Sequence, residues 1–185
     1  MTTVLDSTLV NVRNLSDTSV SYQIPEDHRR VVFRPNETKK ISAGELRKLY
    51  FKPGGQVLLL EYLNIDDQNL RQEFNIPGDV PEYEWTLADV NQLMTSGSID
   101  ALKDALEFGP EAIREAIIDY AINKRISDNN KRKAIEEMTG VQVDQAIRLH
   151  EEAEAALGID NNKPVEQRTR RVSAGTITSG RRVQN

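Results

Sequence analysis

The chain has no cysteine and few aromatic residues, and it contains no long apolar run. Without cysteine it forms no disulfide and carries out no thiolate chemistry. With aromatic residues at 5%, its core must depend on aliphatic side chains. The longest apolar run, Val57–Leu60, is too short to cross a bilayer, and the first ten residues lack the basic and apolar regions of a signal peptide. We therefore expect a soluble protein made in the cytoplasm.

Residues that commonly carry catalysis are also scarce. The two histidines, His28 and His150, lie in different halves of the chain and neither has metal-ligand spacing to a carboxylate. The segment 53–55 has two glycines but lacks the length and the lysine of a phosphate-binding loop. Acidic pairs such as Glu136–Glu137 are typical of a solvated helix face. The sequence predicts a protein that is not an enzyme and has no metal or other cofactor.

Charge is distributed unevenly along the 185 residues. The net charge of −5 combines about −10 over residues 1–162 with +5 over residues 163–185, where six basic residues accompany one acid. An acidic body with a basic end can bind neighbouring copies of itself or a polyanion by electrostatic attraction.

The first part of the chain has the alternation and turn residues of a small antiparallel sheet. A Ser42-x-x-Glu45 capping box predicts a helix over 43–51, and Asp66 and Asp67 predict a cap for a helix over 68–74. The run Val57–Leu63 is compatible with a buried strand or a helix, and its position after two glycines favours a strand. The predicted strands cover 9–12, 20–24, 30–33 and 39–41.

The second part begins after a segment with two prolines and a glycine and has helical periodicity throughout. Trp85, the only tryptophan, is expected to fill the junction between the two parts. Thr86, Ser98 and the pair Ser127–Asp128 are predicted to cap short helices, and Pro110 is predicted as the first residue of another. A last helix covers about 143–157.

The overall prediction is an α+β fold. It has a small antiparallel β part with short helices at the N-terminus, an all-α bundle of short helices, and an extended basic C-terminal arm. The predicted divisions are a β-rich domain at 1–76, a linker at 77–84, a helical domain at 85–158 and a flexible arm at 159–185.

The last helix contains a possible seam with alternating spacings of three and four residues, which resembles a heptad repeat. This seam could pack within the monomer or against a second copy; the intramolecular interpretation is favoured. It consists of Val143, Ala146, His150, Ala153 and Leu157.

The arm is the other candidate for partner binding. Its arginines could contact phosphates or an acidic protein surface, and no aromatic residues lie between them to stack on bases. These residues are Arg168, Arg170, Arg171, Arg181 and Arg182.

Three segments resemble small structural proteins of tailed bacteriophages. They are PGGQVLLLEYLNI, PEYEWTLADVNQLMTSGSIDALKDALEFGPEAIREAIIDYAI and NKRKAIEEMTGVQVDQAI, and the resemblance extends over about residues 5–150. It implies a virion component of the head or neck, present in many copies and made in the host cytoplasm. The arm lies outside it.

We therefore expect a non-enzymatic virion structural protein, associated with the capsid or the head-to-tail junction. Its partners would be major capsid or portal-like subunits, copies of itself, or both, with packaged DNA a possible partner of the arm and no membrane. The alternative is a non-virion phage binding protein, either an inhibitor of a host enzyme or an accessory protein that contacts DNA.

Overall fold

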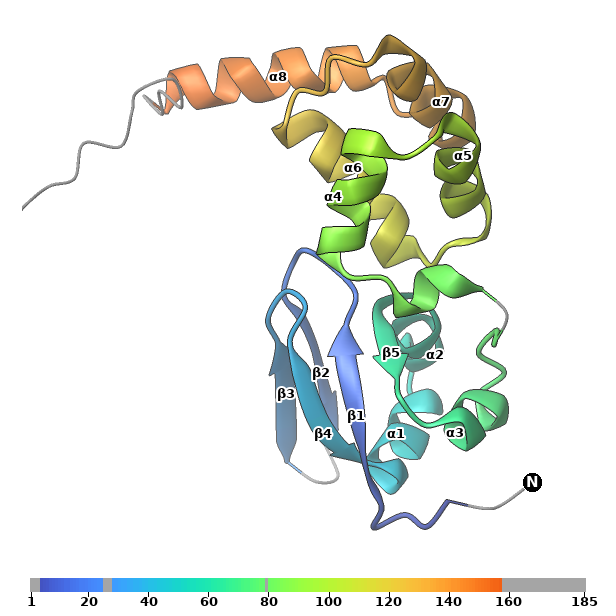
Figure 1. The fold of residues 1–185 in the computed structure, drawn as a ribbon. Helices are drawn as coiled ribbons and strands as arrows, with labels where there is room; N and C mark the ends of the chain where they lie inside the picture. Colours follow the sequence, from blue (N-terminus) through green and yellow to red (C-terminus); the bar gives the residue numbers. More distant parts are fainter. Residues whose placement is uncertain (1–3, 25–27, 79, 158–185) are drawn as a thin grey trace, which may run out of the picture.

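The computed structural model describes residues 4–24, 28–78 and 80–157, which fold into a sheet half and a helical half (Figure 1). The fold is α+β, as predicted. The sheet half contains β1 (Leu9–Asn14), β2 (Val20–Ile24), β3 (Arg29–Phe33), β4 (Thr38–Ser42), α1 (Ala43–Tyr50), α2 (Gly55–Val57), the π-helical turn η2 (Leu58–Tyr62), β5 (Leu63–Ile65) and α3 (Gln68–Glu73). The helical half contains the 3₁₀ turn η3 (Pro81–Glu84), α4 (Leu87–Ser96), α5 (Ile99–Phe108), α6 (Glu111–Asn123), α7 (Asn129–Thr139) and α8 (Val143–Ala156).

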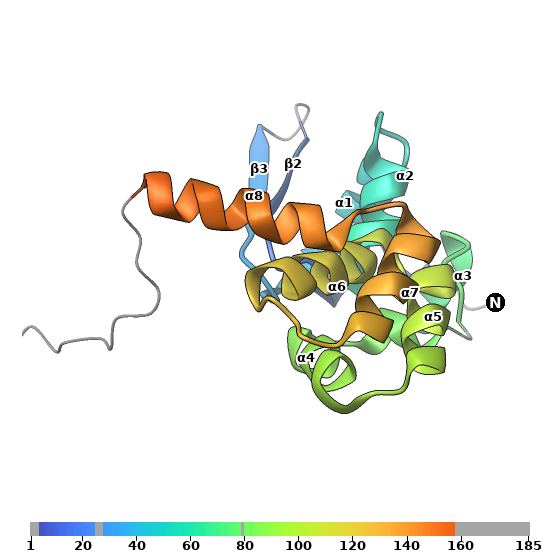
Figure 2. The ribbon, with the colours of Figure 1, turned by 90° about the horizontal axis from the view of Figure 1, so that it is seen from above.

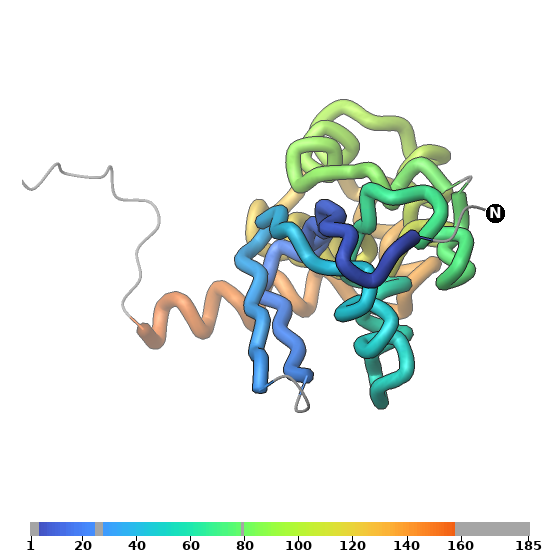
Figure 3. The backbone as a smooth tube through the Cα atoms, turned by 90° about the horizontal axis from the view of Figure 1, so that it is seen from below, coloured from blue at the N-terminus to red at the C-terminus, as the bar shows by residue number. Residues whose placement is uncertain are grey.

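The first strand in the sequence is the central strand of its sheet. β1 pairs antiparallel with β4 on one side and with β5 on the other, placing Val10 opposite Ile41 and Val12 opposite Ile65. β2 and β3 form a separate antiparallel hairpin. Because side chains alternate along a strand, most apolar residues of both sheets lie on their buried faces, whereas Leu9 of β1 and Val32 of β3 are exposed. The hairpin and the α1–α2 segment project from the same side of the molecule (Figure 3).

The run Val57–Leu63 is mostly helical, so the favoured strand interpretation was wrong. Residues Gly55–Tyr62 form α2 and η2, and only Leu63–Ile65 form a strand. A strand buried on both faces would cover the whole run, but the Val57 side chain is 57% exposed. As a helix the run buries Leu59 completely and turns polar side chains towards α6.

Capping predictions at the other helix starts agree with the structure. Ser42, Asp67, Ser98 and Asp128 each accept hydrogen bonds from backbone N–H groups in the first turn of the following helix. Thr86 forms a complete capping box with the third residue of α4. These side chains satisfy donors that have no partner within the helix.

The start of α6 differs from the prediction. Pro110 occupies the N-cap position, and the helix begins one residue later, at Glu111. Since proline offers no side-chain acceptor, the backbone N–H of Glu111 donates instead to Glu61 Oε2 of η2, at 2.8 Å. A residue from the sheet half therefore caps a helix of the helical half.

Further contacts fasten the two halves together. The Tyr62 hydroxyl donates to Glu115 Oε1 of α6 at 2.9 Å, and Arg13 donates to the backbone carbonyls of Glu84 and Trp85, each at 2.8 Å. Burial and the hydrogen bond to Glu115 raise the pKa of Tyr62 to about 12. The buried apolar side chains of both halves form one continuous cluster, against which the half-buried Trp85 packs.

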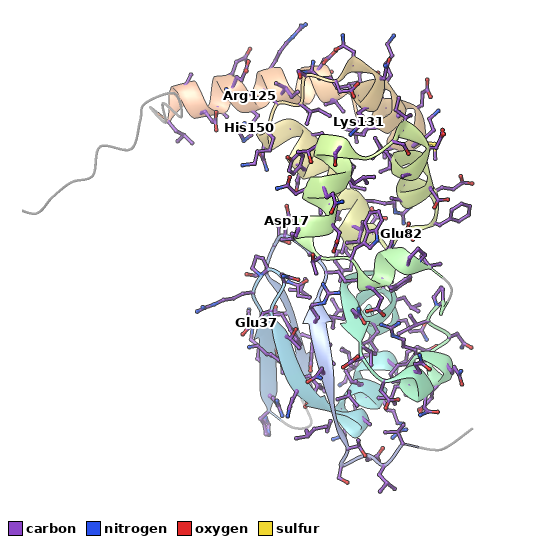
Figure 4. The ribbon with its side chains drawn as sticks, in the orientation of Figure 1. Asp17, Glu37, Glu82, Arg125, Lys131 and His150 are labelled. Atoms are coloured by element: carbon purple, nitrogen blue, oxygen red, sulfur yellow. The ribbon has the colours of Figure 1, made fainter. Side chains whose placement is uncertain are left out.

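Lys131 in α7 is buried, with only 4% of its surface exposed. Its ammonium group donates to the carbonyl oxygens of Leu93 and Met94, at 2.8 and 2.9 Å. These carbonyls lie in the last turn of α4, where the helix carries partial negative charge. Lys131 therefore links α7 to the end of α4: it donates to the Met94 carbonyl and adds a second hydrogen bond to the Leu93 carbonyl, which also accepts from the backbone N–H of Gly97 (Figure 4).

Among the described residues, no helix is long and apolar enough to cross a membrane.

Candidate interaction surface

Helix α8 is attached to the body mainly through its first two turns. Val143 and Ile147, one helical turn apart, are both buried. The helix packs on α6 and α7 through this part. Beyond Ile147, no α8 side chain is buried.

Ion pairs extend the attachment by about one turn. Arg125, which follows α6, pairs with Glu151 at 3.2 Å and with Glu154 at 2.6 Å. His150 Nδ1 lies 3.7 Å from Glu154, within ion-pair range but too far for a hydrogen bond. Arg125 and His150 both lie where α8 passes the end of α6 (Figure 4).

The predicted seam is divided between two environments. Val143 is buried, Ala146 and His150 are half-buried, and Ala153 and Leu157 are exposed. The intramolecular interpretation therefore describes only the first part of the seam. The strict heptad spacing missed Ile147, the second anchor, which the spacing of four residues from Val143 could have identified.

The second half of α8 projects beyond the body. In two perpendicular views, its C-terminal end extends past the other helices (Figures 1 and 2). Leu149 is 58% exposed and Leu157 is 75% exposed, and Ala153 lies between them. Because large apolar side chains gain free energy when water is excluded, this exposed stripe is a candidate contact for another molecule.

The five arginines proposed for partner binding all lie outside the described residues, in the segment that follows α8. They are Arg168, Arg170, Arg171, Arg181 and Arg182. Their contribution to the site therefore remains a prediction from the sequence.

The outer side of α5 carries a row of carboxylates. Asp100, Asp104 and Glu107 are all exposed, whereas Leu102, Ala105 and Leu106 on the opposite side are buried. Because successive residues of an α-helix are rotated by about 100°, the three acids lie within roughly 60° of the helix circumference. Phe108 borders them and is 58% exposed. Composition showed that the body is acidic, but the row became apparent only with the helix boundaries known.

A third surface feature is an open hollow beside α1, with a volume of about 800 Å³. Glu45 on its wall is buried, accepts a hydrogen bond from the Tyr22 hydroxyl at 2.7 Å and pairs with Arg29 at 3.1 Å. Burial and the hydrogen bond to Glu45 raise the pKa of Tyr22 above its ordinary value. Glu45 is thus already engaged by two partners within the sheet half.

The two histidines lie in different halves of the molecule, and His150 has the carboxylate of Glu154 within ion-pair range. His28 is exposed in the turn before β3, with φ of 48°, and His150 lies on α8. In the part of the chain that the structure describes, no three His, Cys, Asp or Glu residues are placed to hold a metal ion.

Comparisons with protein-family models, curated proteins and solved structures gave no significant match. The assignment of a function must therefore depend on the surfaces described above.

Proposed function

We propose that the protein is a non-enzymatic structural component of a bacteriophage virion, located in the capsid or at the head-to-tail junction. It binds neighbouring subunits through the projecting half of α8 and through the basic arm, which acts as a clasp. The neighbours are major capsid or portal-like subunits, further copies of the chain, or both.

The observation that carries this proposal is the projection of α8. Its second half is held to the body by the ion pairs of Arg125 and not by buried side chains, and it exposes Leu149 and Leu157. Contact with another subunit would cover these side chains. The arm follows this helix directly in the sequence.

The arm adds attraction that does not need a precise fit. Five arginines can form several weak contacts, and weak contacts repeated over many copies give high overall avidity. An assembly of identical subunits uses such contacts efficiently.

Mass spectrometry of purified particles tests the location directly. We expect the protein in particles at a constant ratio to the major capsid protein. Its absence from infectious particles would sink the proposal.

A chain ending at Asn162 tests the arm. We expect reduced incorporation into particles with an unchanged thermal unfolding midpoint, because the buried apolar cluster is formed by residues that precede the arm. A matched full-length variant, with all five arm arginines replaced by glutamine, should show the same loss. If this variant instead enters particles normally but loses salt-dependent DNA binding, the DNA-contacting alternative is supported.

A further inference from the structure

The acidic side of α5 has no partner within the described part of the chain. Asp100, Asp104 and Glu107 form no ion pair or hydrogen bond with other described side chains, unlike Lys103, which pairs with Glu137 of α7. Three unpaired carboxylates on one helix face repel one another, and a cationic partner would relieve this repulsion.

The rest of the helical half does not offset this charge. Residues 80–157 contain sixteen acidic and eight basic residues, whereas the described part of residues 4–78 contains eight acidic and ten basic residues. The strongest concentration of positive charge in the sequence is the arm, with six basic residues and one acid over 163–185. The two segments of the same chain are therefore complementary in charge.

The position of α8 indicates which copy supplies the arm. α8 runs away from α5, so that the last described residues and the acidic row lie at opposite ends of the helical half (Figures 1 and 2). The arm follows Leu157 in the sequence, so it begins at the end of the helical half that is remote from its own α5.

We propose that the outer face of α5, formed by Asp100, Asp104, Glu107 and Phe108, is the docking site for the basic arm of a second copy of this chain. The contact is head-to-tail, because one copy contributes the arm and the next contributes the face. Such contacts generate rings or filaments rather than closed two-fold dimers. The inference names the partner of the arm and thus rests on the proposed function.

The spacing of the charges suits this pairing. Asp100 and Asp104 are separated by one helical turn, about 6 Å along the axis. Arg168 and Arg170 are two residues apart, which in an extended chain is about 6.6 Å on one side. Phe108 beside Asp104 provides an aromatic face over which an arginine can lie.

Sedimentation of the full-length protein tests the contact. We expect concentration-dependent association at low ionic strength that weakens at about 0.5 M salt, where screening extends over only a few ångströms. Replacing the row in D100N/D104N/E107Q should weaken association by about tenfold to a hundredfold, since several exposed ion pairs are lost together.

A control variant tests whether position or total charge matters. D66N/E136Q removes two negative charges at exposed positions outside α5 and α8 and should leave association within about twofold, whereas D100N/D104N removes two from the row and should not. Equal effects of the two double variants would overturn the inference.

Charge reversal identifies the two sides of the contact. A chain with lysine at 100, 104 and 107 and a chain with glutamate at the five arm arginines should each remain monomeric alone. When mixed, they should associate again, because the basic arm of the first meets the acidic face of the second and the acidic arm of the second meets the lysine face of the first.

Other results would contradict the inference in distinguishable ways. A monomer whose arm can be crosslinked to its own α5 at all concentrations would show that the contact is intramolecular. Unchanged association of the α5 variants, together with their normal incorporation into particles, would overturn the docking site but leave the proposed function standing. Absence of the unaltered chain from particles would overturn the function while the association measurement still stood.

Discussion

Replacement of Lys131 by methionine tests how the helical half is held together. Methionine keeps most of the length of the side chain but removes the two hydrogen bonds to the carbonyls of Leu93 and Met94. A hydrogen bond from a charged donor contributes about 1.5–3 kcal/mol, and a carbonyl left without a partner in a buried place costs about 1–3 kcal/mol. Removal of a buried charge offsets part of this loss.

We therefore expect K131M to lower the free energy of unfolding by about 2–3 kcal/mol. For a chain of this size, that corresponds to a fall in Tm of roughly 5–10 °C. Urea unfolding followed by circular dichroism measures the difference. The matched control is K133M, on the exposed side of the same helix, whose free energy of unfolding should lie within about 0.5 kcal/mol of that of the unaltered protein.

A K131M protein as stable as the control would refute the reasoning. It would mean that the cost of burying the ammonium group equals the contribution of its two hydrogen bonds. The free energy of unfolding of K131R should lie between those of K131M and the K133M control, because the guanidinium group can donate to both carbonyls but needs more space.

Two further predictions concern α6 and α8. Burial, then the negative charges of Asp17 and Glu115, raise the pKa of Asp119, so the folded protein loses stability as the pH rises from the ordinary aspartate range through this raised pKa. D119N should remove that part of the pH dependence in urea titrations between pH 4 and 7, and an unchanged slope would contradict it. I147A should lower the free energy of unfolding by about 2–3 kcal/mol, because it leaves a cavity at a buried site. L149A, at an exposed site, should change it by less than about 0.5 kcal/mol. Comparable losses for the two variants in thermal unfolding would show that the second half of α8 is covered.

Local signals in the sequence were sufficient for most secondary structure. Capping side chains act within a few residues of the helix that they begin, so Thr86, Ser98 and Asp128 could be identified without knowledge of the fold. The alternation in 9–12 and 20–24 likewise reports one buried face. The α+β class followed from these local patterns.

Features that depend on distant residues could not be predicted in the same way. The helix over Gly55–Tyr62 makes its polar contacts with α6, 50 or more residues away. Glu61 accepts a hydrogen bond from the backbone N–H of Glu111, and the Tyr62 hydroxyl donates to Glu115. The α8 seam is buried at Val143 and exposed at Leu157 because α6 and α7 cover only the first part of the helix. Spacing along α8 identified a stripe but contained no information on how far α6 and α7 extend.

The sheet order also constrains when the protein can fold during synthesis. β1 leaves the ribosome first, yet its two partners are β4 and β5, the second of which ends at Ile65. At about 5–20 residues per second, β1 waits roughly 3–10 s before both of its edges can be paired. Until then the nascent chain presents an open apolar strand, so the N-terminal segment is where chaperones would be expected to act, and slower translation between β1 and β5 should increase aggregation rather than assist folding.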